Sequence, residues 1–179
     1  MRATSPEQLA AIIRDKPLAG RSIVGLDGAA GSGKSTLATA LGPRLGADVV
    51  SLDSFLNRNE GRFFKGLRLP ELRDRLADAK GTTIVEGVLL LQVLEALSVS
   101  CDVLVYVKRV GLGGRWEDEE ECAIDGDPDT LIAGLLADFK AMWPDEHSIP
   151  ALNEEIIRYH AMYRPHERAT VEYWRTEES

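Results

Sequence analysis

The sequence predicts an α/β fold in which helices cover both faces of a parallel sheet. Short apolar runs rich in β-branched residues alternate with amphipathic segments, and this alternation is typical of parallel sheets. A glycine-rich turn joins the first of these runs to a helical segment. The chain has 179 residues and an apolar fraction of 44%, which suits one domain with a sizeable core. Residues 1–179 are therefore expected to form a single domain.

Five runs are predicted to be strands. The run from Asp102 to Val107 is continuous and β-branched, which indicates burial on both faces of the sheet. Asp27, Asp53 and Glu86 stand where the first three strands end. Because ligands of such sheets bind beyond the carboxyl ends of the strands, these carboxylates are expected to face the glycine-rich turn. The five predicted strands span residues 22–27, 48–52, 82–86, 102–107 and 170–174.

Proline and capping residues predict where the helices begin and end. Ser5 and Pro6 open the first helix, and Pro165 stops the last one, since the residue before a proline avoids the helical region. Gly42-Pro43 is expected to end or kink the helix that follows the glycine-rich turn. Further helices are predicted from Pro70, Leu89, Pro128 and Pro150, and residues 54–69 are interpreted as a functional loop with a short helical turn.

The helix that begins at Pro128 has an apolar side. Its apolar residues recur at helical spacing, so this side is expected to pack inward. They are Leu131, Leu135, Leu136, Phe139 and Met142.

The glycine-rich turn fits the phosphate-binding loop pattern G-x-x-x-x-G-K-[ST] at every required position. Glycines let the backbone approach a phosphate, and the N-terminus of the following helix adds partial positive charge. Lys34 is expected to reach the β- and γ-phosphates, and the Ser35 hydroxyl to ligate Mg²⁺. The residues expected to bind the nucleotide here are Gly28, Ala29, Ala30, Gly31, Ser32, Gly33, Lys34, Ser35 and Thr36.

Composition narrows the range of partners. The net charge is −8, so the chain as a whole is not expected to bind nucleic acid. Cys101 and Cys122 have no metal or redox spacing and are interpreted as reduced residues of a cytosolic protein. The N-terminus has no apolar run long enough for a signal peptide or a membrane span. We therefore expect a cytoplasmic protein that does not contact membranes; the sequence does not predict its oligomeric state.

Three blocks, residues 28–36, 51–55 and 84–89, together resemble the uridine kinase and phosphoribulokinase branch of the P-loop kinases. Residues 163–169 also look like the stretch that precedes the last strand of that branch. The resemblance implies a three-layer P-loop NTPase fold with a five-stranded parallel sheet in the order 2-3-1-4-5. It further implies that ATP and Mg²⁺ are bound and that a small molecule accepts the phosphate.

The resemblance also implies roles for individual residues. Asp53 matches the aspartate that takes the proton from the acceptor hydroxyl, and Glu86 matches the glutamate near the magnesium and the acceptor. Each has another interpretation, since Asp53 could cap a turn and Glu86 could bond to a neighbouring loop. Arg164 is placed near the adenine by analogy alone.

Residues 108–126 follow the fourth strand, where uridine kinases carry an arginine-rich lid. Arginines clamp phosphate through paired N–H donors, and Arg115 is the favoured candidate for this role, ahead of Arg109. Three glycines, at 111, 113 and 114, are expected to let the segment move. The acidic run 117–121 is interpreted as a solvated face.

Two functions are weighed, and a kinase-type toxin that acts on a sugar nucleotide also remains open, since many such enzymes share this core. The first is an ATP-dependent kinase that phosphorylates a hydroxyl of a nucleoside-like or other small metabolite. The second is a nucleotide-binding regulatory protein with little transfer activity, which the sparse lid would favour. A guanine-nucleotide switch is excluded because no N-K-x-D element exists in the chain. The basic residues of the 54–69 loop fit either an anionic acceptor or a solvated surface: Arg58, Arg62, Lys65 and Arg68.

Overall fold

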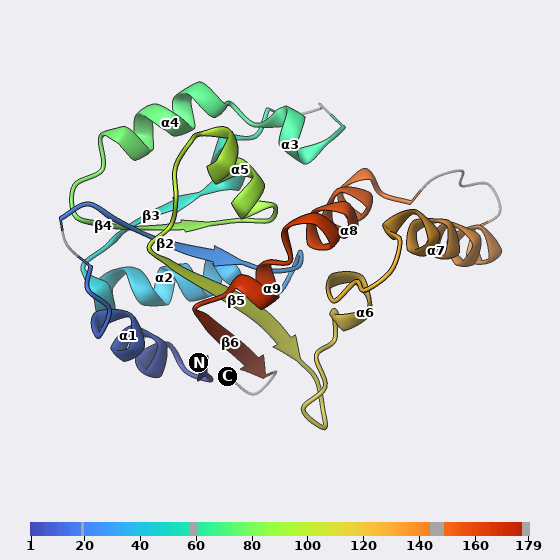
Figure 1. Cartoon of the computed structure of the whole chain (residues 1–179), viewed down its shortest axis with the longest axis horizontal. Helices are drawn as coiled ribbons and strands as arrows, with labels where there is room; N and C mark the ends of the chain where they lie inside the picture. The colour runs from blue at the N-terminus through green and yellow to red at the C-terminus, as the bar shows by residue number, and fades with distance from the viewer. Residues whose placement is uncertain (19, 58–60, 144–148, 177–179) are drawn as a thin grey trace.

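A six-stranded parallel sheet forms the centre of the protein, as seen in the computed structural model of the chain (Figure 1). The structure describes residues 1–18, 20–57, 61–143 and 149–176. The strand order is β1-β6-β5-β2-β4-β3. The strands are β1 Arg2–Ala3, β2 Ser22–Asp27, β3 Asp48–Ser51, β4 Thr82–Glu86, β5 Val103–Val110 and β6 Val171–Thr176.

The predicted order of five strands is confirmed, because the run from β3 through β4, β2 and β5 to β6 reproduces it. The prediction of only five strands is wrong: β1 adds a sixth strand beside β6, with Arg2 opposite Glu172 and Ala3 opposite Tyr173. A strand of two residues is too short to show any alternating pattern, so this strand could not be predicted from the sequence.

Helices cover both faces of the sheet. The apolar faces of α1 and α2 pack on one side, and those of α4 and α5 pack on the other (Figure 1). No helix among the described residues is long and apolar enough to cross a membrane. The helices are α1 Pro6–Arg14, α2 Lys34–Leu45, η1 Leu52–Phe55, α3 Phe63–Gly66, α4 Leu69–Ala77, α5 Leu90–Ala96, α6 Glu119–Cys122, α7 Pro128–Met142, α8 Ala151–Tyr163 and α9 Pro165–Arg168.

Helix α2 does not end at Gly42-Pro43 but continues to Leu45. Proline removes one backbone donor from a helix, yet the buried face of α2 continues through Leu41 and Gly42. The helix ends at Gly46, which adopts the left-handed conformation with φ of 60°, and the N–H of Ala47 donates to the carbonyl of Gly42. Packing therefore holds the helix together across the proline.

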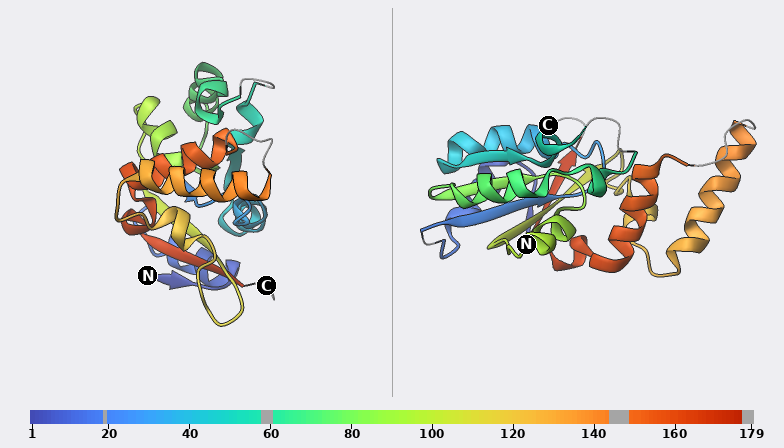
Figure 2. Two further views of the ribbon diagram at one scale, coloured as in Figure 1. Left: turned by 90° about the vertical axis from the view of Figure 1, so that its right-hand side faces the viewer. Right: turned by 90° about the horizontal axis from the view of Figure 1, so that it is seen from above.

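Helix α7 begins after Asp127 as predicted, but its apolar side does not pack inward. None of its residues is fully buried, and Met142 is 64% exposed. The helix projects away from the sheet and contacts α8 instead (Figure 2). The apolar side of α7, predicted from the helical spacing, is therefore only partly covered by α8.

The segment after the fourth predicted strand contains regular secondary structure. Residues 108–110 complete β5, and Val110 pairs with Trp116 in an antiparallel bridge. The three glycines of the segment lie in or beside this turn, and α6 follows. The predicted lid-like segment is thus a strand end, a tight turn and one short helix.

Candidate active site

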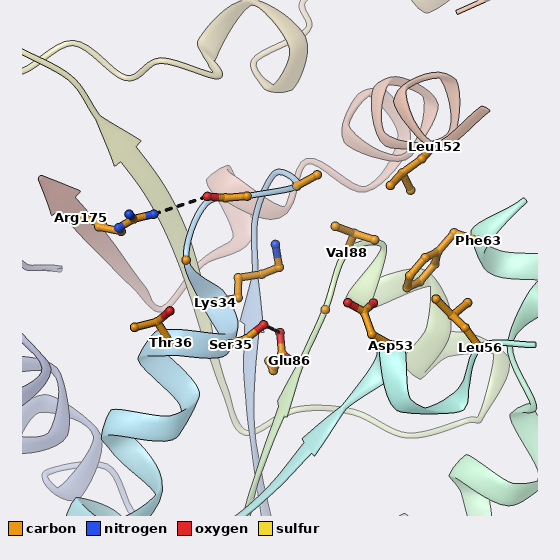
Figure 3. Close-up of a pocket in the computed structure, with 14 residues that line it drawn as sticks. Lys34, Ser35, Thr36, Asp53, Leu56, Phe63, Glu86, Val88, Leu152 and Arg175 are labelled. Carbon is orange, nitrogen blue, oxygen red and sulfur yellow. Dashed lines mark hydrogen bonds between the residues drawn. The ribbon is translucent and has the colours of Figure 1, made fainter. Parts of the chain in front are cut away.

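The phosphate-binding loop leaves the carboxyl end of β2 and enters α2 (Figure 3). Its shape depends on glycine. At Gly28, where φ is +148°, a Cβ atom would lie 2.5 Å from the carbonyl oxygen of Val107. Gly33 precedes the helix in the left-handed conformation with φ of 97°. These glycines let the loop turn beside β5 and present its backbone at the N-terminus of α2.

Lys34 folds back over the loop that precedes it. Its Nζ donates to the carbonyl oxygens of Gly28 at 3.1 Å and Ala29 at 2.6 Å, and it lies 3.4 Å from Oγ of Ser32. Burial lowers the pKa of Lys34, and the nearby carboxylate of Asp27 opposes that effect. The loop carbonyls thus hold this ammonium group at the opening where the motif expects phosphate.

Glu86 and Ser35 meet beside the loop. The Ser35 hydroxyl donates to Oε2 of Glu86 at 3.2 Å, and Glu86 is only 3% exposed at the end of β4. A hydroxyl and a carboxylate are oxygen ligands of the kind that Mg²⁺ prefers. The donor set therefore fits the predicted magnesium site.

Asp27 is buried at the end of β2. Its carboxylate accepts hydrogen bonds from the Tyr159 hydroxyl and, at 2.8 Å, from the N–H of Gly28. Burial raises the pKa of Asp27 to about 6. This side chain anchors the start of the loop to α8 and does not line the cavity described next.

A cavity of about 530 Å³ opens above the loop (Figure 3). Lys34, Ser35, Thr36 and Glu86 lie on one side, and Asp53, carried by η1, lies across from them. Beyond Asp53 the wall is apolar and consists of Leu56, Phe63, Val88 and Leu152. The cavity therefore joins a phosphate-binding side to an apolar side, with a carboxylate between them.

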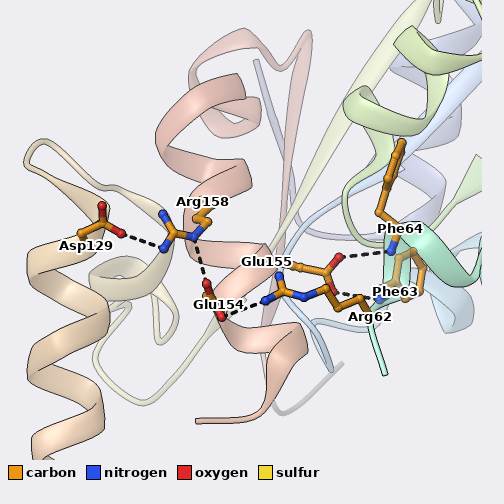
Figure 4. A network of polar contacts seen from close by, with 7 residues as sticks. All are labelled: Arg62, Phe63, Phe64, Asp129, Glu154, Glu155 and Arg158. Atoms are coloured by element: carbon orange, nitrogen blue, oxygen red, sulfur yellow. Dashed lines mark hydrogen bonds and ion pairs between the residues drawn. The ribbon is translucent and has the colours of Figure 1, made fainter. Parts of the chain in front are cut away.

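Helix α8 holds the apolar wall in place (Figure 4). The Glu155 carboxylate accepts the backbone N–H groups of Phe63 at 2.8 Å and Phe64 at 3.2 Å, at the start of α3. Next to it, Glu154 pairs with Arg62 at 3.5 Å and Arg158 at 3.1 Å. A contact at the N-terminus of a helix satisfies donors that have no partner within it. The position of Phe63 in the cavity therefore depends on α8.

The structure brings together most of the predicted site residues, but not all. Lys34, Ser35, Thr36, Asp53 and Glu86 share the cavity with three residues of the loop: Ala30, Gly31 and Gly33. The other predicted loop residues, Gly28, Ala29 and Ser32, are buried beneath it and hold its shape.

Two predicted arginines do not line the cavity. The Arg115 side chain is 72% exposed and pairs with Glu120 at 3.2 Å, and Arg164 pairs with Glu167 at 3.1 Å at the end of α8. The reason is local: each arginine has a carboxylate a few residues away in sequence, within reach of its guanidinium group. The placement of Arg115 as a lid arginine and of Arg164 near the adenine therefore has no support in this geometry.

Arg175 does line the cavity, and the sequence reasoning missed it. It lies on β6, where its Nη1 donates to the carbonyl oxygen of Gly31 at 3.4 Å. The sequence signal was present: Arg175 follows the predicted final strand, and ligands bind beyond the carboxyl ends of parallel strands. The predicted strand ended at Trp174, one residue too early to include it.

Comparison with known proteins rests on structure alone, because no family model and no curated protein matches the chain. The chain is similar to a possible uridine kinase from Bacillus stearothermophilus, at 16% identity and a TM-score of 0.54, with 94% of this chain and 96% of that chain covered. A shikimate kinase from Acinetobacter baumannii, in complex with shikimate, matches at 15% identity and a TM-score of 0.44, covering 85% and 82% of the two chains. A gluconokinase from Sinorhizobium meliloti 1021 matches at 17% identity and a TM-score of 0.37, covering 83% and 93%. The first of these matches spans nearly all of both chains, and it shows that this chain has the fold of the P-loop kinases.

Proposed function

We propose that this protein is an ATP-dependent kinase that transfers the γ-phosphate of ATP to a hydroxyl group of a small molecule. One observation carries the proposal: Lys34 and Ser35 of the phosphate loop share a cavity with two carboxylates, Asp53 and Glu86. Phosphoryl transfer needs positioning and neutralised charge more than covalent chemistry, and these residues supply both. ATP and Mg²⁺ belong to the proposal.

Each residue has a distinct task in this scheme. Lys34 and the loop N–H groups hold the phosphate chain, and Ser35 with Glu86 holds the magnesium ion. Bound magnesium neutralises charge on the phosphate oxygens. Asp53 faces the apolar side of the cavity, where it accepts the proton of the acceptor hydroxyl.

The apolar wall favours an uncharged acceptor, either nucleoside-like or another small metabolite. Leu56, Phe63, Val88 and Leu152 offer no charge to pair with an anionic substrate. Two of the nearby basic side chains are engaged elsewhere: Arg62 pairs with Glu154, and Arg68 donates to the carbonyl oxygens of Leu56 at 2.9 Å and Ser54 at 3.0 Å. Arg58 lies outside the described residues. Of the two interpretations of this basic loop, the solvated surface therefore has the stronger support.

A nucleotide-binding regulatory protein with little transfer activity is the second candidate. The position of Arg115 outside the cavity favours it, because an arginine lid usually completes a phosphoryl-transfer site. Asp53 favours the kinase, since a regulatory protein has no need of a base beside an acceptor cavity. The two candidates differ in whether phosphate is transferred.

The phosphate loop can be tested by ligand-induced stabilisation. Mg²⁺ with ATP is expected to raise the melting temperature of the wild type, because a ligand that binds only the folded state stabilises it. Lys34→Ala should lose most of that rise, whereas Lys140→Ala, on the exposed surface of α7, should keep it. Equal rises in wild type and Lys34→Ala would remove the basis of the proposal. A screen for ADP production against nucleosides, sugars and vitamin precursors then separates the kinase from the regulatory protein.

A further inference from the structure

Two arginines stand side by side at the carboxyl end of the sheet. Arg109 on β5 and Arg175 on β6 are direct neighbours in the register of these strands. Both approach the phosphate loop: a Cβ atom placed on Gly31 would lie 3.9 Å from Nη1 of Arg109, and one placed on Gly33 would lie 2.8 Å from Cδ of Arg175. Arg175 thus lies at the edge of the loop opposite Asp53 (Figure 3), and Arg109 is its neighbour on β5.

The two guanidinium groups differ in their partners. The Nε atom of Arg109 lies 2.5 Å from Oε2 of Glu117, and its Nη2 atom lies 2.8 Å from Oδ1 of Asp118. Arg175 donates only a long hydrogen bond, to the carbonyl of Gly31, and within the described ranges no carboxylate forms an ion pair with it. Arg109 is therefore already neutralised, while Arg175 keeps its charge available at the rim of the cavity.

Two acidic residues after the turn, Glu117 and Asp118, explain why Arg109 is paired and Arg175 is not. Without Glu117 and Asp118, two neighbouring guanidinium groups would repel each other beside the loop. With Arg109 held by both carboxylates, the charge of Arg109 no longer opposes that of Arg175 beside the loop. This part of the acidic run therefore serves the site, and it is more than a solvated face.

We propose that Arg175 binds the phosphate chain of the nucleotide from the side of β6 and takes the role that the sequence suggested for Arg115. A guanidinium group offers phosphate two parallel N–H donors, and such bonds are stronger than neutral ones. Arg175 can make them by exchanging its long bond to Gly31 for phosphate oxygens. This inference rests on the proposed function, since it needs a nucleotide in the phosphate loop.

The test measures the dissociation constant of Mg²⁺–ATP by calorimetry for the wild type and for Arg175→Ala, Arg175→Lys, Arg115→Ala and Arg75→Ala. Losing a hydrogen bond to a charged partner corresponds to roughly a tenfold or greater loss of affinity, which is expected for Arg175→Ala. Arg175→Lys should lie between this variant and the wild type, because it keeps the charge but not the paired donors. Arg75 pairs with Asp48 on the surface, so Arg75→Ala controls for the loss of one positive charge.

Each outcome decides a different point. If the wild type binds no Mg²⁺–ATP, the proposed function fails, and the inference fails with it. If the wild type binds and both Arg175 variants match it, the inference alone is overturned. If Arg115→Ala weakens binding while Arg175→Ala does not, Arg115 holds the role. A melting temperature measured without ligand checks that each variant is folded, and Arg175→Lys carries the test should Arg175→Ala not fold.

Discussion

The buried carboxyl of Asp27 should make stability depend on pH in a way that one substitution removes. Its ordinary pKa is 3.8, and burial raises it to about 6 in the folded protein. The folded state therefore binds a proton more readily than the unfolded state, so the contribution of Asp27 to stability falls as pH rises through this window. The opposing effects come from Tyr159, the Gly28 amide and Lys34, which favour the charged form.

The size of the effect follows from the two pKa values. At pH 5 the folded carboxyl is about nine-tenths protonated and the unfolded one is almost fully ionised, whereas at pH 8 both are ionised. Proton binding therefore adds on the order of 1 kcal/mol to the unfolding free energy at pH 5 relative to pH 8. For a chain of this size that corresponds to about 2–4 °C in melting temperature.

Asp27→Asn removes the titrating group and keeps an oxygen that can accept one hydrogen bond. Thermal and urea unfolding of the wild type and the variant at pH 5 and pH 8 measures the change, and titrating groups that do not interact with Asp27 cancel in the comparison. The unfolding free energy of the wild type, relative to that of Asp27→Asn, should be higher at pH 5 than at pH 8 by on the order of 1 kcal/mol. Tyr159→Phe, which removes a donor to the charged form, should increase the dependence on pH. Parallel profiles for wild type and Asp27→Asn would refute the reasoning.

Two further predictions concern the cavity. Asp53→Asn should bind Mg²⁺–ATP nearly as well as the wild type but transfer phosphate at least about a hundredfold more slowly in single-turnover assays, because general bases contribute about 10²–10⁴-fold to the rate. The control Glu86→Gln should alter the magnesium dependence as well as the rate. If Asp53→Asn keeps the full rate of transfer, the Asp53 side chain is a structural cap. Glu155→Gln should weaken the contact with α3 and lower the unfolding free energy by about 1–2 kcal/mol, with faster hydrogen exchange at residues 63–66 and an unchanged affinity for ATP. Unchanged exchange there would show that α3 does not depend on α8.

Most of the sheet could be predicted because each strand carries its own local signal. Thr82–Glu86 matches the predicted strand at both ends, and the helix from Pro128 begins where its cap suggested. Asp53 and Glu86 were predicted from the rule that ligands bind beyond the carboxyl ends of parallel strands, and both line the cavity.

What the sequence could not supply depends on contacts between distant segments. Arg175 matters because β6 lies beside β5 at the loop, and Glu155 matters because α8 lies against α3. Neither of these contacts between distant segments can be predicted from the spacing of residues in the sequence. The covered side of α7 was misjudged for the same reason, since periodicity shows that a helix has an apolar side but not what lies opposite.

The short strand β1 has a consequence for how the protein is made. Its neighbour in the sheet is β6, where the N–H of Glu172 donates to the carbonyl of Met1. The Cζ atom of Arg2 also lies 3.4 Å from the centroid of the Trp174 ring. During synthesis the first strand therefore remains without its partner until residues 171–176 have been made. The same late strand carries Arg175, so the edge of the sheet and the rim of the cavity are completed in one step, after the rest of the domain is available to fold.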